Sequence, residues 1–526
     1  MDTAEFVEFA KASIDFVANY LETLRDRNVL PNVQPGYLSK LLPEEAPQKS
    51  EKWQEVLKDV ERYIIPGMTH WNSPHFHAYF PTANSYPGIV AEMMSSAFSC
   101  IGFSWTSSPV CTELEVLMCN WLCKLLDLPD KFLFTNDGTG GGIIQGSASE
   151  CTLVCILAAK DYTMRRIKTL NPEMDENTIK SKLVAYTSIQ SNCSVEKAAS
   201  LGSVQIRLLP VDDKHSLLGA TLRKAVEEDL AKGLIPCCVI ATLGTTGTCG
   251  FDKLDEIGPV CEEYDIWLHI DAAYAGAAFL CPEYRYLMSG IEYADSFNVN
   301  AHKWLLVNFD ASVMWVKDTK RLTDAFSIER IYLPHSNAEL PDYRNWQIHL
   351  GRRFRSLKLW FVFRIYGQEG LQNHIRQQIK LAKLFEEYVL SDARFEVVTK
   401  AFMALVCFRV KGDDSLTKKL FDRLQARKRI YVVASTYQDK YVIRFVICSR
   451  LCREDDVAFA WNEISSQATE LLQEEHYKTS VENIAKVTDD NVKVSNIANE
   501  HNIAPAFLSS EYLHETFAKE LSSRHI

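Results

Sequence analysis

The stretch Trp267-Leu-His-Ile-Asp271-Ala-Ala-Tyr274 decides the fold class, because an apolar run ends in an aspartate and small residues follow it. This is the pattern of a buried strand and the turn after it. Comparable apolar runs alternate with segments of helical periodicity. The runs are Leu183-Val-Ala-Tyr186, Cys238-Val-Ile-Ala-Thr242 and Ala311-Ser-Val-Met-Trp-Val316, and the helical segments include Cys111 to Leu126 and Ser149 to Ile167. From about residue 86 to 360 the alternation predicts an α/β domain with a mainly parallel sheet.

The chain is expected to have four parts. In residues 1–85 we expect a helical arm that is too small to be a robust domain. The arm should pack against something else, such as a second copy of the chain. We expect residues 86–360 to form the large domain and residues 361–478 to form a smaller α+β domain. In the smaller domain we expect a long helix from Leu371 to Leu390, strands at Ala404 to Val410 and Tyr441 to Ile447, and a final helix near Asp455 to Glu475. Residues 479–526 are polar and weakly patterned, which predicts a flexible or loosely docked tail.

Composition narrows the class of protein. The chain has 526 residues, 47% of them hydrophobic, and can bury a large core. A formal net charge of -11 without a block of Lys and Arg argues against nucleic acid and favours a small-molecule partner. Residues Met1 to Tyr20 lack an uninterrupted apolar core and no run is long enough to span a bilayer, so we expect a cytoplasmic protein. The fifteen cysteines are scattered without metal-site spacing, so we expect reduced thiols and no metal.

The segment Asn298-Val-Asn300-Ala-His302-Lys303-Trp304 places a lysine among apolar residues. A lysine so enclosed is costly unless it is paired, exposed or used in chemistry. Burial lowers the pKa of an ammonium and makes the amine available as a Schiff-base nucleophile. Taken alone, Lys303 is more often an ordinary lysine that is paired with an acid or extends its ammonium to solvent.

Two further segments change the balance. Asp271 ends a predicted strand, where ligand groups gather in α/β sheets, and could hold a pyridinium nitrogen protonated; it could also be a turn or helix-capping residue. Gln145-Gly-Ser147-Ala-Ser149-Glu runs directly into an amphipathic helix, whose free N–H groups favour phosphate, although many such loops only begin helices. The preceding Gly138-Thr-Gly-Gly-Gly142 lacks the Lys-Ser/Thr of a P-loop, so nucleotide hydrolysis is disfavoured.

In combination these segments resemble the group II decarboxylases that depend on pyridoxal 5'-phosphate (PLP), specifically the aromatic-L-amino-acid decarboxylase family. The resemblance covers about residues 1 to 478. It rests on Phe80-Pro-Thr82, Gly102-Phe103-Ser-Trp, Gly146-Ser-Ala-Ser149-Glu, Ala241-Thr-Leu-Gly-Thr-Thr246, His269-Ile-Asp-Ala-Ala-Tyr274, Asn300-Ala-His-Lys303-Trp and Leu350-Gly-Arg-Arg-Phe-Arg-Ser356. It implies the fold-type-I PLP transferase architecture and a homodimer.

The resemblance also implies roles for individual residues. Lys303 would carry the cofactor as a Schiff base, Asp271 would pair with the pyridinium nitrogen, and Tyr332 would protonate the substrate carbon after carbon dioxide leaves. The remaining cofactor and substrate positions are Ala148, Ser149, Asn300 and His302 at the phosphate, Thr246 and Asn192 at the ring, Tyr79, Phe80 and Thr82 in the substrate pocket, and Ile101 and Phe103 reaching the pocket from the neighbouring subunit.

Asn192 departs from the family pattern, because the typical decarboxylase has a histidine there, stacked on the cofactor ring. An imidazole can donate and accept protons near neutral pH, whereas an amide does not titrate. The same change resembles the insect 3,4-dihydroxyphenylacetaldehyde synthases, in which molecular oxygen reacts in place of protonation. This resemblance implies oxidation of L-DOPA to the catechol aldehyde with release of carbon dioxide, ammonia and hydrogen peroxide, and roles in catecholamine metabolism and cuticle cross-linking.

Two alternative functions stay open. Asn192 is also readable as a neutral change in an ordinary decarboxylase that makes dopamine or serotonin. From another class, the chain could be a catalytically silent PLP-fold binding protein, although the presence of Lys303, Asp271 and Tyr332 argues against that. The ranking of L-DOPA against other aromatic amino acids does not follow from the sequence.

Overall fold

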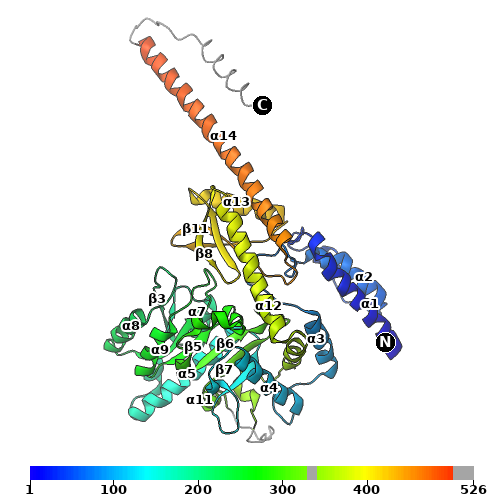
Figure 1. Cartoon of the computed structure of the whole chain (residues 1–526), viewed down its shortest axis with the longest axis vertical. Helices are drawn as coiled ribbons and strands as arrows, with labels where there is room; N and C mark the ends of the chain where they lie inside the picture. The colour runs from blue at the N-terminus through cyan, green and yellow to red at the C-terminus, as the bar shows by residue number, and fades with distance from the viewer. Residues whose placement is uncertain (328–339, 501–526) are drawn as a thin grey trace. The chain divides into compact units, whose positions relative to one another are not determined.

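The computed structural model describes residues 1–327 and 340–500, with side chains described as far as residue 482 (Figure 1). The chain divides into two compact units, Met1–Ile464 and Ser465–Ile526. The boundaries expected near residues 85, 360 and 478 stay predictions. The two sheets of the first unit lie on either side of residue 360 in the sequence.

A seven-stranded sheet forms the centre of the first unit, and the part of the chain around it is called the large domain below. Its strands are β1 (Gly141–Gln145), β2 (Leu183–Ser188), β3 (Gln205–Leu209), β4 (Ile235–Thr242), β5 (Trp267–Asp271), β6 (Ser296–Asn300) and β7 (Ser312–Val316). Their spatial order is β1-β7-β6-β5-β4-β2-β3, and all neighbours are parallel except the two pairs that involve β7. The predicted α/β class with a mainly parallel sheet is confirmed. Apolar residues on both faces of these strands explain why their sequences form near-continuous hydrophobic runs.

Helices cover this sheet (Figure 1). They are α4 (Pro109–Leu125), α5 (Ala148–Leu170), α6 (Glu176–Lys182), α7 (Cys193–Gly202), α8 (Gly219–Ala231), α9 (Leu254–Glu263) and α11 (Thr319–Phe326). The main core lies between α5 and the sheet, where Val154 and Ala158 pack with Ala185, Ile240 and Met314. Each large apolar side chain buried there contributes about 1.5–3 kcal/mol, so the helix is held firmly on the strands.

Strand β1 is not among the apolar runs that predicted strands, and it begins with two glycines. The closeness of two tryptophans explains both the glycines and the strand. A Cβ on Gly141 would lie 2.8 Å from the Trp346 ring, and one on Gly142 would lie 2.7 Å from the Trp315 ring. Both distances are too short for any side chain, so glycine is required for β1 to pair with β7.

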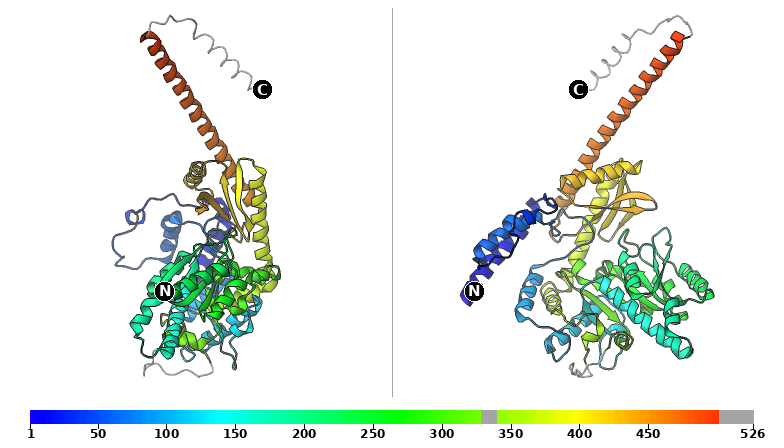
Figure 2. Two further views of the ribbon diagram at one scale, coloured as in Figure 1. Left: turned by 90° about the vertical axis from the view of Figure 1, so that its left-hand side faces the viewer. Right: turned by 180° about the vertical axis from the view of Figure 1, so that it is seen from behind.

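A second sheet in the same unit has four antiparallel strands in the order β10-β11-β9-β8, and the part of the chain around it is called the smaller domain below. Its elements are α12 (Ser356–Ser391), β8 (Phe395–Phe402), β9 (Leu405–Val410), α13 (Asp414–Arg427), β10 (Val433–Tyr437) and β11 (Lys440–Val446). Helix α12 begins earlier than the expected Leu371, and its two parts meet at Gly367, whose φ of 64° is left-handed. Figure 2 shows α12 running from the large domain to the smaller sheet.

The N-terminal part contains α1 (Thr3–Glu22), α2 (Trp53–Asp59) and α3 (Tyr86–Phe98). The segment between α2 and α3 connects the two sheets. Phe76 bridges to Tyr431 of the smaller domain, and the N–H of Ala83 donates to the carbonyl of His302 at 2.7 Å. Residues before α3 are thereby held against the turn that carries Lys303.

The last helix, α14 (Glu454–Glu500), continues well beyond the end expected near Glu475. No glycine or proline interrupts the sequence from Glu475 to Glu500, so no residue there breaks the helix. Among the described residues, no helix has the length and apolar character to cross a membrane. The fifteen cysteines are free thiols, and all but Cys100 and Cys193 are buried.

The ion pair between Arg352 and Glu115 should be a strong determinant of stability, because its side chains are only 1% and 4% exposed. Glu115 also accepts the N–H of Ile144 in β1 at 2.7 Å. Replacement Arg352→Ala leaves a buried carboxylate without its cation and should lower the free energy of unfolding by about 3–5 kcal/mol. Arg353, whose side chain is 58% exposed in its pair with Glu92, is the control: Arg353→Ala should cost less than about 1 kcal/mol. Urea denaturation of both variants checks this, and equal losses would contradict it.

Candidate active site

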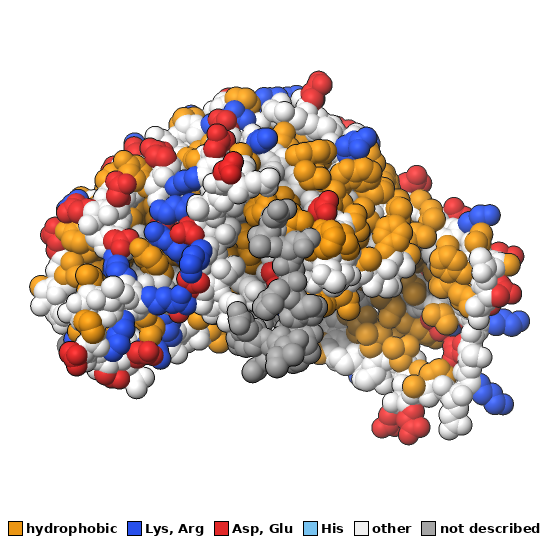
Figure 3. Space-filling model, turned by 90° about the horizontal axis from the view of Figure 1, so that it is seen from below, with side chains coloured by type: hydrophobic (Ala, Val, Ile, Leu, Met, Phe, Trp, Pro, Cys, Tyr) orange, Lys and Arg blue, Asp and Glu red, His pale blue; other side chains and the backbone are white. Residues whose placement is uncertain are grey.

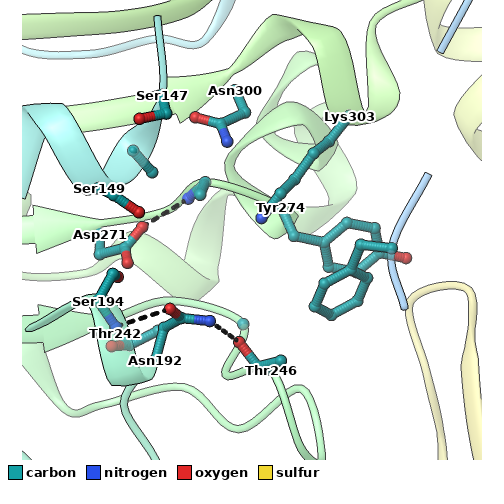
Figure 4. A pocket seen from close by; sticks show the side chains of 14 residues that line it. Ser147, Ser149, Asn192, Ser194, Thr242, Thr246, Asp271, Tyr274, Asn300 and Lys303 are labelled. Carbon is teal, nitrogen blue, oxygen red and sulfur yellow. Dashed lines mark hydrogen bonds between the residues drawn. The ribbon is translucent and has the colours of Figure 1, made fainter. Parts of the chain in front are cut away.

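A cavity opens where the carboxyl ends of β1, β4, β5 and β6 meet at one edge of the sheet, next to the N-terminus of α7. Its wall consists of Phe80, Ser147, Ala148, Ser149, Asn192, Ser194, Thr242, Gly244, Thr246, Asp271, Ala273, Tyr274, Asn300 and Lys303. Parallel strands bring these residues together because each polar side chain lies at or just after the end of a strand. Figure 4 shows their side chains around one space.

Lys303 lies in the short helix α10 (Ala301–Trp304) that follows β6, and its side chain extends into the cavity (Figure 4). Its Nζ is 5.4 Å from the centroid of the Phe80 ring. Burial lowers the pKa of the Lys303 ammonium, and the negative charge of Asp271 partly opposes this shift. A lowered pKa increases the fraction of neutral amine, which is the nucleophilic form.

Asp271 is the last residue of β5 and is only 5% exposed. Its Oδ1 accepts the N–H of Ala273 at 3.0 Å, which fixes the carboxylate at the start of the following turn. The side chain faces the cavity (Figure 4). A buried carboxylate in this position suits a partner that carries a proton on nitrogen.

The N-terminus of α5 forms another side of the cavity. Ser147 caps the helix, and its Oγ accepts the N–H of Glu150 at 3.2 Å. The first helical N–H groups, at Ala148 and Ser149, have no intrahelical acceptor. Together with the helix dipole they favour an anionic group. Asn300 lies across from them, and its Oδ1 accepts the Ser312 hydroxyl at 2.6 Å.

Asn192 is held at both ends of its amide. It caps α7, with Oδ1 accepting the N–H of Ser194 at 3.0 Å, and its Nδ2 donates to the Thr246 Oγ1 at 3.0 Å. Figure 4 draws both hydrogen bonds. The amide therefore joins the start of α7 to the loop after β4, and both oxygen and nitrogen are engaged within the protein.

An aromatic stack forms the wall on the side of Lys303. Phe80 stacks on Tyr274 with centroids 3.9 Å apart, and Tyr274 stacks on Trp304 at 4.8 Å. The Tyr274 hydroxyl accepts the N–H of Ala404 from the smaller domain at 3.3 Å, and burial raises the pKa of this phenol well above its usual value. The stack fixes the residue after Lys303 and restricts solvent near the amine.

Most of the predicted positions meet in this cavity. They are Phe80, Ala148, Ser149, Asn192, Thr246, Asp271, Asn300 and Lys303. His302 does not line it: its Nδ1 accepts the N–H of Ala311 at 2.8 Å, and burial lowers its pKa to about 4. Tyr332 lies outside the described residues. Four predicted substrate positions, Thr82, Tyr79, Ile101 and Phe103, are not in the wall either.

Two of these four are strongly exposed in the single chain. Ile101 is 56% exposed, and Tyr79 is 46% exposed with its hydroxyl 2.8 Å from that of Tyr431. Sequence reasoning did not single out Ser147, Ser194, Thr242, Gly244, Ala273 and Tyr274 as site residues. Thr242 and Ala273 could have been found from their positions at strand ends, whereas Ser194 depends on how α7 packs.

The chemistry of the wall fits PLP. The α5 N-terminus suits a phosphate, Asp271 suits a ring nitrogen, and Lys303 supplies an amine for covalent attachment. Small residues such as Ala273 and Gly244 leave room for a flat ring between the strand ends and Asn192. These groups lie around one cavity, as a single bound cofactor requires.

Comparisons with known proteins agree with this chemistry. The conserved domain of pyridoxal-dependent decarboxylases matches residues 35–411. The chain is 54% identical to the aromatic-L-amino-acid decarboxylase of Drosophila simulans over 90% of this chain and 93% of that protein, and 53% identical to the 3,4-dihydroxyphenylacetaldehyde synthase of Aedes aegypti over 90% and 91%. The crystal structure of Oryza sativa TDC with PLP and tryptamine matches with a TM-score of 0.87 and 36% identity, over 90% of this chain and 99% of that one.

Replacement Lys303→Ala should abolish turnover and remove the visible absorbance of covalently bound PLP, because no amine remains in the cavity to attach the cofactor. Absorbance spectra after PLP loading and gel filtration measure the attachment. Lys197→Ala, on the neighbouring helix α7 and outside the cavity wall, is the control and should keep the spectrum. Retained absorbance or turnover in Lys303→Ala would refute the assignment.

Proposed function

Because the chain belongs to the pyridoxal-dependent decarboxylase family and is a PLP enzyme, we propose that it oxidises L-DOPA to 3,4-dihydroxyphenylacetaldehyde. The reaction consumes one O2 and one water, and releases CO2, NH3 and H2O2. Loss of CO2 leaves an electron pair on the α-carbon of the substrate. Oxygen accepts this pair and becomes peroxide, and water then releases the aldehyde and ammonia. In an ordinary decarboxylase the same carbon takes a proton and gives the amine.

The observation that carries this proposal is the amide at Asn192. Among the described residues of the cavity wall there is no histidine. The nearby His302 accepts a backbone N–H and has a pKa of about 4, so it is neutral at pH 7. Tyr274 keeps its proton because burial raises its pKa. The described wall therefore lacks an imidazole that could deliver a proton to the substrate carbon near neutral pH, which favours reaction with oxygen over protonation.

Bound PLP would supply an electron sink that stabilises negative charge on the α-carbon. The residues of the cavity wall would bind and orient this cofactor. We assign the α5 N-terminus, with Ala148 and Ser149, to the phosphate together with Asn300, and Asp271 to the ring nitrogen. His302 stays a proposed phosphate residue, although it does not line the cavity of the single chain. Lys303 provides the attaching amine. Asn192 and Thr246, joined by a hydrogen bond of 3.0 Å, restrict the face of the ring. We retain Tyr332, Thr82, Tyr79 and Phe80 as proposed catalytic or substrate residues.

The alternative function is decarboxylation of L-DOPA or 5-hydroxytryptophan to the amine. It is supported by relatives such as the Drosophila simulans protein, which is named a decarboxylase and is as similar to this chain as the aldehyde synthase of Aedes aegypti. A silent binding protein is disfavoured because a buried amine and a buried carboxylate face one cavity at a cost that binding alone does not require. A cytoplasmic location stays a prediction.

The test is aerobic incubation of the PLP-loaded enzyme with L-DOPA, with dopamine, aldehyde, peroxide and oxygen uptake measured together. Equal amounts of aldehyde and peroxide with little dopamine would support the proposal, and dopamine without oxygen uptake would refute it. Asn192→His restores a titratable ring and should move the product ratio toward dopamine by at least about tenfold. Cys193→Ser, one residue further and outside the wall, should leave the ratio unchanged. An unchanged ratio of aldehyde to dopamine in Asn192→His would show that Asn192 does not determine the product.

We also propose that the enzyme is a homodimer joined through α3. This helix exposes a row of large apolar side chains, namely Tyr86, Val90, Met93, Met94 and Phe98, and Ile101 follows it. Figure 3 shows hydrophobic side chains gathered on one side of the face seen from below. Exposed apolar patches of this kind are typical of interfaces. A second copy of the chain bound at α3 would cover Ile101 and Phe103, and these residues could then reach the cavity of the neighbouring subunit.

Light scattering should give twice the 59.9 kDa mass of one chain. Phe98→Glu places a charge in the apolar row and should shift the mass toward a single chain. Leu170→Glu, at a single exposed leucine on α5 that is 69% exposed, should not. A single-chain mass for the unmodified enzyme would contradict the dimer.

A further inference from the structure

Polar side chains with unpaired atoms surround Asp271 on the face of the sheet that α5 covers. We call Thr242, His269 and Asn298 the polar socket. Thr242 and Asn298 are the register partners of Asp271 on the two neighbouring strands, and His269 precedes it by two residues on the same strand. Residues opposite one another, or two apart in a strand, project from the same face. The three side chains therefore lie around the carboxylate.

The polar socket is buried and unsatisfied. His269 and Asn298 are fully buried, and Thr242 is 4% exposed. The Thr242 Oγ1, the His269 Nε2 and both polar atoms of the Asn298 amide have no well-formed hydrogen bond among the described residues, while the Asn298 amide lies close enough to the His269 ring to raise its pKa. Each buried polar group left unpaired costs about 1–3 kcal/mol. A cluster of such groups next to one carboxylate indicates a functional reason for keeping them.

The ring of His269 is held from the side away from Asp271. The indole N–H of Trp267 donates to the Ser296 Oγ at 2.8 Å, and that oxygen is 2.8 Å from the His269 Nδ1. An indole N–H only donates, so the Ser296 oxygen accepts from Trp267 and also shares a hydrogen bond with the His269 Nδ1. Burial lowers the pKa of His269 to about 4, so the ring is neutral at pH 7.

We propose that His269 and Asn298 are positioning residues that hold the Asp271 carboxylate toward the cavity. The inference rests on the proposed role of Asp271 at the cofactor nitrogen. Neither side chain is hydrogen-bonded to Asp271 in the structure, so they act through the dipoles of the buried imidazole and the buried amide. Such dipoles are effective where water is excluded and the dielectric constant is low. A neutral imidazole supplies the dipole without a second positive charge that would compete with a protonated cofactor ring.

The test uses the full-length, PLP-saturated enzyme and measures the Kd for PLP and the visible absorbance of the bound cofactor. His269→Gln and Asn298→Leu should each raise the Kd about tenfold and alter the absorbance band. Asn298→Leu keeps the imidazole and decides the question if His269→Gln does not fold. His215→Gln is the matched control, because His215 is also buried with an unpaired Nε2 but is not on a strand next to Asp271. It should leave Kd and spectrum unchanged.

A double-mutant cycle separates positioning from a merely structural role. If His269 acts through Asp271, then His269→Gln should change the Kd by less than about twofold when Asp271→Asn is already present. The same increase in both backgrounds, or no increase in either, would overturn the inference alone. Unchanged Kd and absorbance in Asp271→Asn itself would overturn the proposed role of Asp271 and this inference with it.

Discussion

Burial of α5 against the seven-stranded sheet is the constraint on which the site depends. Core residues such as Val154 and Ile240 are removed from water only if the strands run side by side beneath the helix. Once β2, β4, β5 and β6 are parallel, their carboxyl ends must meet at one edge. The same packing directs the N-terminus of α5 toward that edge. Phosphate, ring and amine positions therefore follow from how the core is packed.

This edge of the sheet becomes a binding site because aromatic side chains partly close it to solvent. Phe80, Tyr274 and Trp304 stack beside Lys303, and Ala404 of the smaller domain donates to the Tyr274 hydroxyl. Water is thereby restricted around the amine, and charges there interact more strongly than they would in solvent. This explains how Asp271 can influence Lys303 while burial still lowers the pKa of the ammonium. The smaller domain thus contributes to chemistry without lending a charged group to the cavity wall.

Family membership and product differ in what determines them. The cofactor needs a phosphate cradle, a carboxylate and an amine, and these groups are present together in the cavity. The fate of the electron pair depends instead on which proton donors and oxygen reach one carbon atom. Relatives with the two different names are about equally similar to this chain, so overall identity does not separate them. Asn192, bound to Thr246 and Ser194, is the residue at which the distinction is most readily argued.

The sequence by itself determined the strand that ends at Asp271 and the α/β class, and it singled out Lys303 as a candidate for a chemically useful amine. These follow from local apolar runs and from the high cost of burying a charge without a use. It could not show that Gly141 and Gly142 form a strand, because only the rings of Trp346 and Trp315 explain those glycines. Nor could the sequence show the polar socket or the hydrogen bond from Asn192 to Thr246, which lie 54 positions apart. Those contacts join residues distant in the chain, and only the packing of strands and helices decides which distant residues meet.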